Sequence, residues 1–144
     1  MPVTEARVTI PQPPQLVFQR ARDIQAIARN MPNVDAIKIL VNEPNRTVVA
    51  WTGRTYGRTV RWTEEDHWDP QNLTCHFKQV QGDFDSFSGT WTFQAVPGGT
   101  EFVHRLVWEL NIPLLGPLLQ GVIKKAVQDN SNAIAAAIAA ICQA

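Results

Sequence analysis

The sequence has little charge, and its charges cancel. Of the 144 residues, 13 are Lys or Arg and 13 are Asp or Glu, so the formal net charge is zero. Such a chain lacks the basic surface typical of nucleic-acid-binding proteins and the polybasic segment typical of proteins that bind anionic membranes. We therefore expect no DNA partner, and charge gives RNA binding no support.

Cysteines and long apolar runs are also scarce. Cys75 and Cys142 lie far apart and do not have the spacing of metal ligands. The N-terminus lacks the basic and apolar regions of a signal peptide. The most apolar segment, near the C-terminus, is interrupted by Lys124, Lys125 and Asp129. We expect reduced thiols, a cytoplasmic location and no stable membrane insertion.

Motifs of catalytic and metal sites are missing as well. His67, His76 and His104 fall on different expected strands and do not form a metal motif. Gly82 and Gly89 precede a strand instead of opening a helix, so they do not form a phosphate loop. We expect no metal, no cofactor and no catalytic constellation. Whether the protein is an enzyme stays open, and the pattern favours a binding module.

The chain does contain enough sequence for one domain, which we expect to span residues 1–144. The segment Val3–Ile10 alternates as a strand does. Pro14 and Asp23 are typical starts of two short helices, the second of which ends before Pro32.

Strands and turns follow from about Ala36 to Leu110. Turns with the sequences EPNR, DPQN and PGG each join two strands. This succession predicts an antiparallel meander. Together with the first strand, the meander is expected to form a curved sheet of about seven strands.

The chain ends in one long Ala-rich helix after Pro117. Taking about 100° per residue, one apolar stripe runs its length. The stripe consists of Leu119, Ile123, Ala126, Ile134, Ala137 and Ile141, and the opposite side carries Lys124, Lys125, Gln128 and Asn132. Alanines in the stripe either leave room beneath the helix or allow close packing, and both readings stay open. A curved sheet closed by this helix is an α+β helix-grip fold.

Large rings alternate with small residues in GDFDSFSGTWTFQAVPGGT, residues 82–100. Because side chains alternate across a strand, Phe87, Gly89, Trp91 and Phe93 should face the long helix. On the next strand, Phe102, His104, Leu106, Trp108 and Leu110 share the inner face. These rings form either ordinary core or the lining of a cavity.

Polar residues on the expected inner surfaces have two readings each. His104 is either a hydrogen-bonded core residue or a functional group. Asn130, at the centre of the helix stripe, either bonds to a neighbouring side chain or water, or anchors a ligand. Glu64, Glu65 and Asp66 could be acid–base carboxylates, but we expect a solvated strand end with a polar mouth.

The segment VRWTEEDHWDPQNLTCHFKQVQGDFDSFSGTWTFQAVPGGTEF, residues 60–102, resembles the START/Bet v 1-like (SRPBCC) superfamily. The similarity is to its polyketide cyclase/dehydrase and coenzyme-Q-binding-protein branch. The segment NIPLLGPLLQGVIKK, residues 111–125, is similar to the way the family's last helix begins. The resemblance implies a START domain in which the sheet and the C-terminal helix enclose an apolar cavity. Members bind lipids, quinones or polyketides, some are cyclases, and one bacterial branch acts on ribosomes.

The resemblance and the residues together predict a protein that binds, transports or senses a hydrophobic small molecule. The expected ligand contacts are Trp62, Phe77, Phe87, Trp91, Phe93, His104, Trp108 and Asn130. Leu114, Leu115 and Leu118 could form an apolar gate or a partner-facing patch. One alternative is a polyketide cyclase/dehydrase-type enzyme that uses His104, Asn130 or Arg61. Another is a protein- or ribosome-interaction module. The sequence does not predict the oligomeric state.

Overall fold

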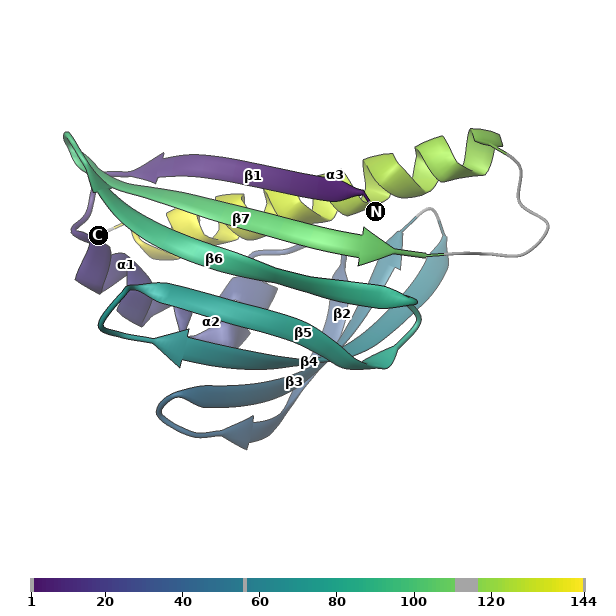
Figure 1. Ribbon diagram of the computed structural model, residues 1–144, viewed down its shortest axis with the longest axis horizontal. Helices are drawn as coiled ribbons and strands as arrows, with labels where there is room; N and C mark the ends of the chain where they lie inside the picture. The colour runs from purple at the N-terminus through teal and green to yellow at the C-terminus, as the bar shows by residue number, and fades with distance from the viewer. Residues whose placement is uncertain (1, 56, 111–116, 144) are drawn as a thin grey trace.

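Seven antiparallel strands form one curved sheet in the computed structural model, which describes residues 2–55, 57–110 and 117–143 (Figure 1). The spatial order is β1-β7-β6-β5-β4-β3-β2, so β1 closes the meander by pairing with the last strand. The strands are β1 (Val3–Ile10), β2 (Val34–Asn42), β3 (Arg46–Thr55), β4 (Arg58–Asp69), β5 (Thr74–Gly82), β6 (Ser86–Val96) and β7 (Gly99–Glu109). The expected helix-grip fold is confirmed.

Two short helices connect β1 to β2, as the prolines and Asp23 predicted. Helix α1 (Pro14–Ala21) begins at a proline. Proline suits this position, because a backbone N–H in the first turn would have no acceptor within the helix. Helix α2 (Ile24–Arg29) is capped by Asp23, whose Oδ1 accepts the Ala26 N–H at 3.1 Å. Both helices lie with α3 (Pro117–Ile141) behind the sheet in Figure 1.

The buried side of α3 differs from the predicted stripe. The buried residues of α3 are Val127, Ser131, Ala135, Ala137 and Ile138, and of these only Ala137 belongs to the predicted stripe. Ile123, Ala126 and Ile134 of the predicted stripe are only half-buried. The reason is that part of the predicted stripe lines a cavity, where side chains are less covered than in a packed core.

Both readings of the alanines therefore apply, at different places along α3. Ala126 lines the cavity in the N-terminal half of the helix. Ala135 and Ala137, in the C-terminal half, are 4% and 1% exposed and belong to the closely packed core.

Rings fill the space between the sheet and the short helices. Phe18 of α1 makes edge contacts with Trp68 and Phe93, at centroid distances of 5.7 and 5.4 Å. Phe93 also contacts Phe102 at 5.2 Å. We call this region the filled end of the molecule, because aromatic side chains pack against one another there.

Gly89 allows β6 to lie close to its neighbours. A Cβ atom there would overlap the carbonyl oxygen of Arg105 and come within 2.7 Å of Cζ of Phe77. The ring of Phe77 therefore occupies the space that a side chain at position 89 would need. This explains a glycine inside a strand of otherwise large inward residues.

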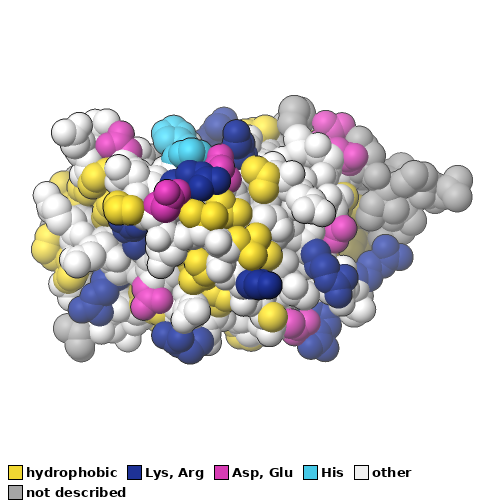
Figure 2. Space-filling model, turned by 90° about the horizontal axis from the view of Figure 1, so that it is seen from below, with side chains coloured by type: hydrophobic (Ala, Val, Ile, Leu, Met, Phe, Trp, Pro, Cys, Tyr) yellow, Lys and Arg dark blue, Asp and Glu magenta, His cyan; other side chains and the backbone are white. Residues whose placement is uncertain are grey.

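The outer surface carries mixed charge. Near the centre of the face shown in Figure 2, basic and acidic side chains lie next to each other. Arg46 and Glu65, for example, form an ion pair of 3.0 Å, and His67 lies 2.8 Å from the same carboxylate. Among the described residues, no helix is long and apolar enough to span a membrane.

Candidate functional site

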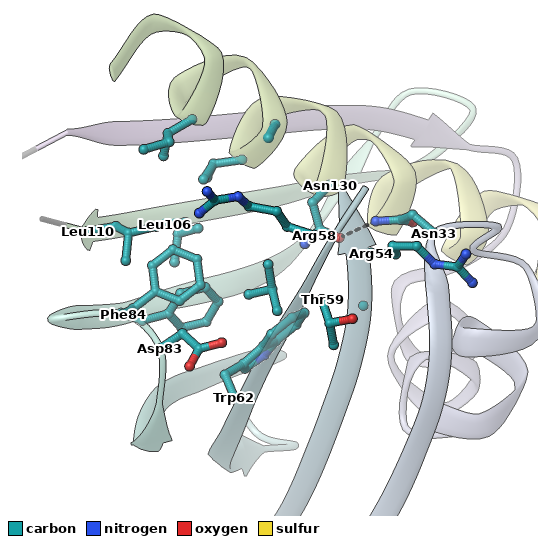
Figure 3. Close-up of a pocket in the computed structure, with 16 residues that line it drawn as sticks. Asn33, Arg54, Arg58, Thr59, Trp62, Asp83, Phe84, Leu106, Leu110 and Asn130 are labelled. Carbon is teal, nitrogen blue, oxygen red and sulfur yellow. Dashed lines mark hydrogen bonds between the residues drawn. The ribbon is translucent and has the colours of Figure 1, made fainter. Parts of the chain in front are cut away.

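A cavity of about 380 Å³ lies between the N-terminal half of α3 and the strands beneath it (Figure 3). We call it the main cavity. Its lining comes from the segment before β2, from β3 and β4, from the loop between β5 and β6, from β6, from β7 and the residue after it, and from α3. The lining residues are Asn33, Gly53, Arg54, Arg58, Thr59, Val60, Trp62, Asp83, Phe84, Phe87, Leu106, Leu110, Ile123, Ala126, Val127 and Asn130.

The rings of Trp62, Phe84 and Phe87 form one wall of the main cavity. Trp62 is buried and lies parallel to Trp51 of the neighbouring strand, with ring centroids 5.9 Å apart and an interplanar angle of 6°. Phe87 follows at 6.0 Å from Trp62, and Phe84 lies 4.9 Å from Phe87. This row of rings offers an apolar surface suited to a flat or alicyclic ligand.

Charged side chains surround the opening of the main cavity. Asp83 accepts the backbone N–H of Arg61 at 2.8 Å, and Arg54 forms an ion pair with Asp35 at 2.8 Å. Figure 3 shows Arg58 stretched between α3 and Phe84. The opening is therefore polar while the interior is apolar, as in most small-molecule pockets.

Asn130 links α3 to the segment before β2. Its Oδ1 accepts a hydrogen bond from Nδ2 of Asn33 at 3.1 Å, and both residues line the main cavity. The amide thus bonds to a neighbouring side chain, as one of its two readings expected, and it still faces the cavity.

A second, small cavity of about 20 Å³ lies deeper in the molecule. Trp62, Phe87 and Asn130 line both cavities and so form the boundary between them. The other residues around the small cavity are Met31, Trp51, Glu64, Phe77, Trp91, His104 and Ile134. It has the size of a single water molecule.

His104 is neutral at physiological pH. The residue is 1% exposed and its ring lies between Phe77 and Trp91, at 5.4 and 6.3 Å. Burial lowers the pKa of this imidazole to about 3, because the cation would lose its hydration without gaining a partner. Its Nδ1 has no hydrogen-bond partner within the described part of the chain.

Glu64 and Asp66 are buried, so the expectation of a solvated strand end is wrong for these two residues. They are 9% and 3% exposed, on the inner face of β4 beside Trp62 and Trp68. Only Glu65, between them, points to the outer face, where it pairs with Arg46. The polar mouth lies instead at the other end of β4, near Arg58.

The two buried carboxyl groups belong to a chain of hydrogen bonds. Glu64 accepts the indole N–H of Trp62 at 3.0 Å. Thr47 donates to Asp66 at 2.8 Å and accepts from the indole of Trp68 at 2.9 Å. Burial, followed by the charge of Glu64, raises the pKa of Asp66 to about 11. Asp66 is therefore protonated at neutral pH and shares a hydrogen bond with Glu64.

The structure separates the eight expected ligand contacts into three groups. Trp62, Phe87 and Asn130 line the main cavity, whereas Phe77, Trp91 and His104 line only the small one. Phe93 and Trp108 line neither cavity. Phe93 lies in the filled end, and Trp108 donates its indole N–H to Thr4 at 3.0 Å.

Sequence reasoning missed the residues at the opening. Arg58 shares its side of β4 with Val60 and Trp62, so strict alternation would have placed it inward. Arg61 lies on the outer face of that strand and is exposed. Leu114 and Leu115, proposed as a gate, lie outside the described residues, as does the side chain of Leu118.

A metal centre finds no support in the described ranges. No group of three or more His, Cys, Asp or Glu side chains there could hold a metal ion. Both Cys75 and Cys142 are buried free thiols.

Comparison with protein-family models matches residues 10–135 to the family described as polyketide cyclase / dehydrase and lipid transport. Comparison with curated proteins gave no match.

Solved structures of similar proteins share the whole fold. A protein from Thermus thermophilus is 33% identical, with a TM-score of 0.93, covering 98% of this chain and 97% of that one. The Zhui aromatase/cyclase from a Streptomyces species is 21% identical, with a TM-score of 0.86 and coverage of 98% and 93%. A START superfamily protein from Mycobacterium smegmatis is 15% identical, with a TM-score of 0.72 and coverage of 94% and 96%.

Proposed function

The chain belongs to the polyketide cyclase / dehydrase and lipid transport family, and on that premise we propose that it binds a hydrophobic small molecule in the main cavity, as a carrier or sensor. The ligand class is a lipid, a quinone or a polyketide-like compound. The observation that carries this proposal is the apolar cavity of about 380 Å³ beneath α3.

The size and lining of the main cavity support binding driven by apolar burial. Its volume falls in the range of small-molecule sites. Covering roughly 200 Å² of apolar ligand surface would contribute about 5 kcal/mol at 25 cal/mol per Å². Trp62, Phe84 and Phe87 provide the ring surface, and Leu106, Leu110 and Ile123 provide the aliphatic remainder.

The polar groups support one orientation of the ligand. Its apolar body would lie against Trp62 and Phe87, and any charged group would remain near Arg58 at the opening. We place this function in the cytoplasm, because a reducing compartment preserves buried free thiols such as Cys75 and Cys142.

Filling the main cavity with a side chain tests the proposal. Ala126 lines the cavity on α3, whereas Ala136 of the same helix is exposed. We expect Ala126→Trp to weaken binding of the neutral fluorescent probe N-phenyl-naphthylamine at least about tenfold, since the indole occupies the ligand's space. Ala136→Trp should bind like the wild type. Equal affinities in all three proteins, or no binding to the wild type, would contradict the proposal.

A cyclase of polyketide-like substrates is the second candidate, favoured by the family description and by the buried titratable groups around the small cavity. His104 would accept a proton only weakly, given its low pKa. Turnover of a poly-β-ketone substrate that is lost in His104→Ala would support this candidate. Turnover retained in that variant would remove His104 from the mechanism.

A further inference from the structure

The two cavities have a common boundary, so a ligand in the main cavity has direct neighbours in the small one. Trp62, Phe87 and Asn130 line both. The small cavity, at about 20 Å³, has room for one oxygen-sized group. A group that projects from the ligand past these three side chains would enter it.

The tryptophans divide into two classes by the partner of the indole N–H. The chain has five tryptophans. Trp62, Trp68 and Trp108 donate to Glu64, Thr47 and Thr4 at 3.0, 2.9 and 3.0 Å.

The remaining two tryptophans are different. The Nε1 atoms of Trp51 and Trp91 are buried and have no hydrogen-bond partner among the described residues. Both side chains line the small cavity, and they are 6% and 7% exposed. A buried donor without an acceptor is unfavourable. Both unpartnered indoles therefore border a cavity that could hold an acceptor for them.

The side chains around the small cavity favour a ligand group that accepts a hydrogen bond over one that donates a hydrogen bond or is purely alkyl. An indole can only donate a hydrogen bond. Glu64 also lines the cavity, but its Oε1 already accepts from Trp62, and Asp66 beside it carries a proton. Nδ1 of the neutral His104 is a third polar atom without a partner in the described part of the chain.

We propose that the small cavity is a polar subsite in which the indole N–H of Trp51 or Trp91 donates to a carbonyl or hydroxyl oxygen of the bound ligand. This proposal rests on the proposed function, because the ligand's apolar body occupies the main cavity. It narrows the ligand class to apolar molecules that carry an oxygen on the end inserted deepest. The oxygen takes the place that a single buried water would otherwise hold.

A matched pair of probes tests the subsite. Tetralone and tetralin differ only in a ketone oxygen that replaces two hydrogens. In the double variant Trp51→Phe, Trp91→Phe, a smaller aromatic ring remains at each position and both indole N–H groups are gone. We expect this variant to bind tetralone roughly fivefold to tenfold more weakly than the wild type does, and tetralin within about twofold. The control Trp68→Phe removes an indole N–H that is already partnered by Thr47 and should leave the ratio of the two affinities unchanged.

A second measurement follows ligand binding in the wild-type protein and uses variants only to assign signals. The indole N–H signals of Trp51 and Trp91 are assigned in ¹H–¹⁵N spectra from the single Phe variants. Tetralone should move at least one of them downfield, and tetralin should not.

The outcomes separate the subsite from the proposed function. If both probes bind but their affinity ratio is the same in the wild type and the double variant, the small cavity is a water site only and the subsite is overturned. If neither probe binds the wild type, the proposed function fails, and the subsite with it.

Discussion

At the scale of single residues, the buried Glu64–Asp66 pair makes stability depend on pH at neutral and alkaline values. Both carboxyl groups are buried on β4, and a proton on Asp66 avoids two adjacent negative charges. The folded state holds this proton up to a pH of about 11, whereas the unfolded chain releases it near 3.8, the ordinary pKa of an aspartic acid. The stabilisation is therefore complete below pH 3.8 and is lost progressively as the pH rises.

The first prediction is that Asp66→Asn removes this pH dependence. The amide has nearly the same shape and cannot ionise. Between pH 7 and 9, the unfolding free energy of the wild type should fall by about 1.4 kcal/mol per pH unit relative to that of Asp66→Asn. Urea titrations at several pH values measure the difference. Asp35→Asn is the control, because Arg54 lowers the pKa of Asp35 and confines its effect to acid pH. Parallel curves for wild type and Asp66→Asn would show that Asp66 is ionised when folded.

At the scale of secondary-structure elements, the pairing of β6 with its neighbours depends on the absence of a side chain at Gly89. Gly89 lies where β6 pairs with both β5 and β7, opposite Phe77 and Leu106. The ring of Phe77 lies over the glycine and also borders the small cavity. A side chain at position 89 would displace the ring and disturb the strand pairing.

The second prediction compares two Gly→Ala substitutions. Gly89→Ala should destabilise the protein by about 2 to 3 kcal/mol, because the new methyl group overlaps Phe77 and the backbone of β7. Gly121→Ala, in α3 with nothing within 4 Å of the new atom, should stabilise it by about 0.5 to 1 kcal/mol. Denaturant unfolding measures both. A neutral Gly89→Ala would mean that β6 can shift outward.

Local sequence patterns were sufficient to predict the elements, but they could not predict which inward rings face a cavity. Alternation correctly placed Phe87, Trp91 and Phe93 on one face of β6. Phe93 nevertheless packs against Phe18, while Phe87 lines both cavities. The difference depends on where α1 lies along the strand, which is a property of the tertiary structure. The burial of Glu64 and Asp66 was missed for the same reason, since charge alone indicated an exposed strand end.

At the scale of the whole molecule, the space between sheet and helices has two different ends. The filled end, beneath α1, is packed with the rings of Phe18, Trp68, Phe93 and Phe102. The main cavity occupies the other end, beneath the first half of α3. A ligand would therefore stabilise only part of the fold directly.

The third prediction is a local response to ligand. Saturating tetralone should increase hydrogen-exchange protection of α3 amides around Ile123–Asn130, because the ligand adds contacts to that half. Amides around Ala135–Ile138, which already belong to the packed core, should change little. Exchange followed by mass spectrometry resolves the two halves. Equal protection along all of α3 would indicate global stabilisation instead.

The parallel stacking of Trp51 on Trp62 has an optical consequence. Two indoles 5.9 Å apart with an interplanar angle of 6° couple their electronic transitions. Trp62 lines the main cavity and Trp51 the small one, so this pair borders both compartments. The protein thus contains its own chromophore beside both cavities, and its circular dichroism and fluorescence should report a bound ligand without any added label.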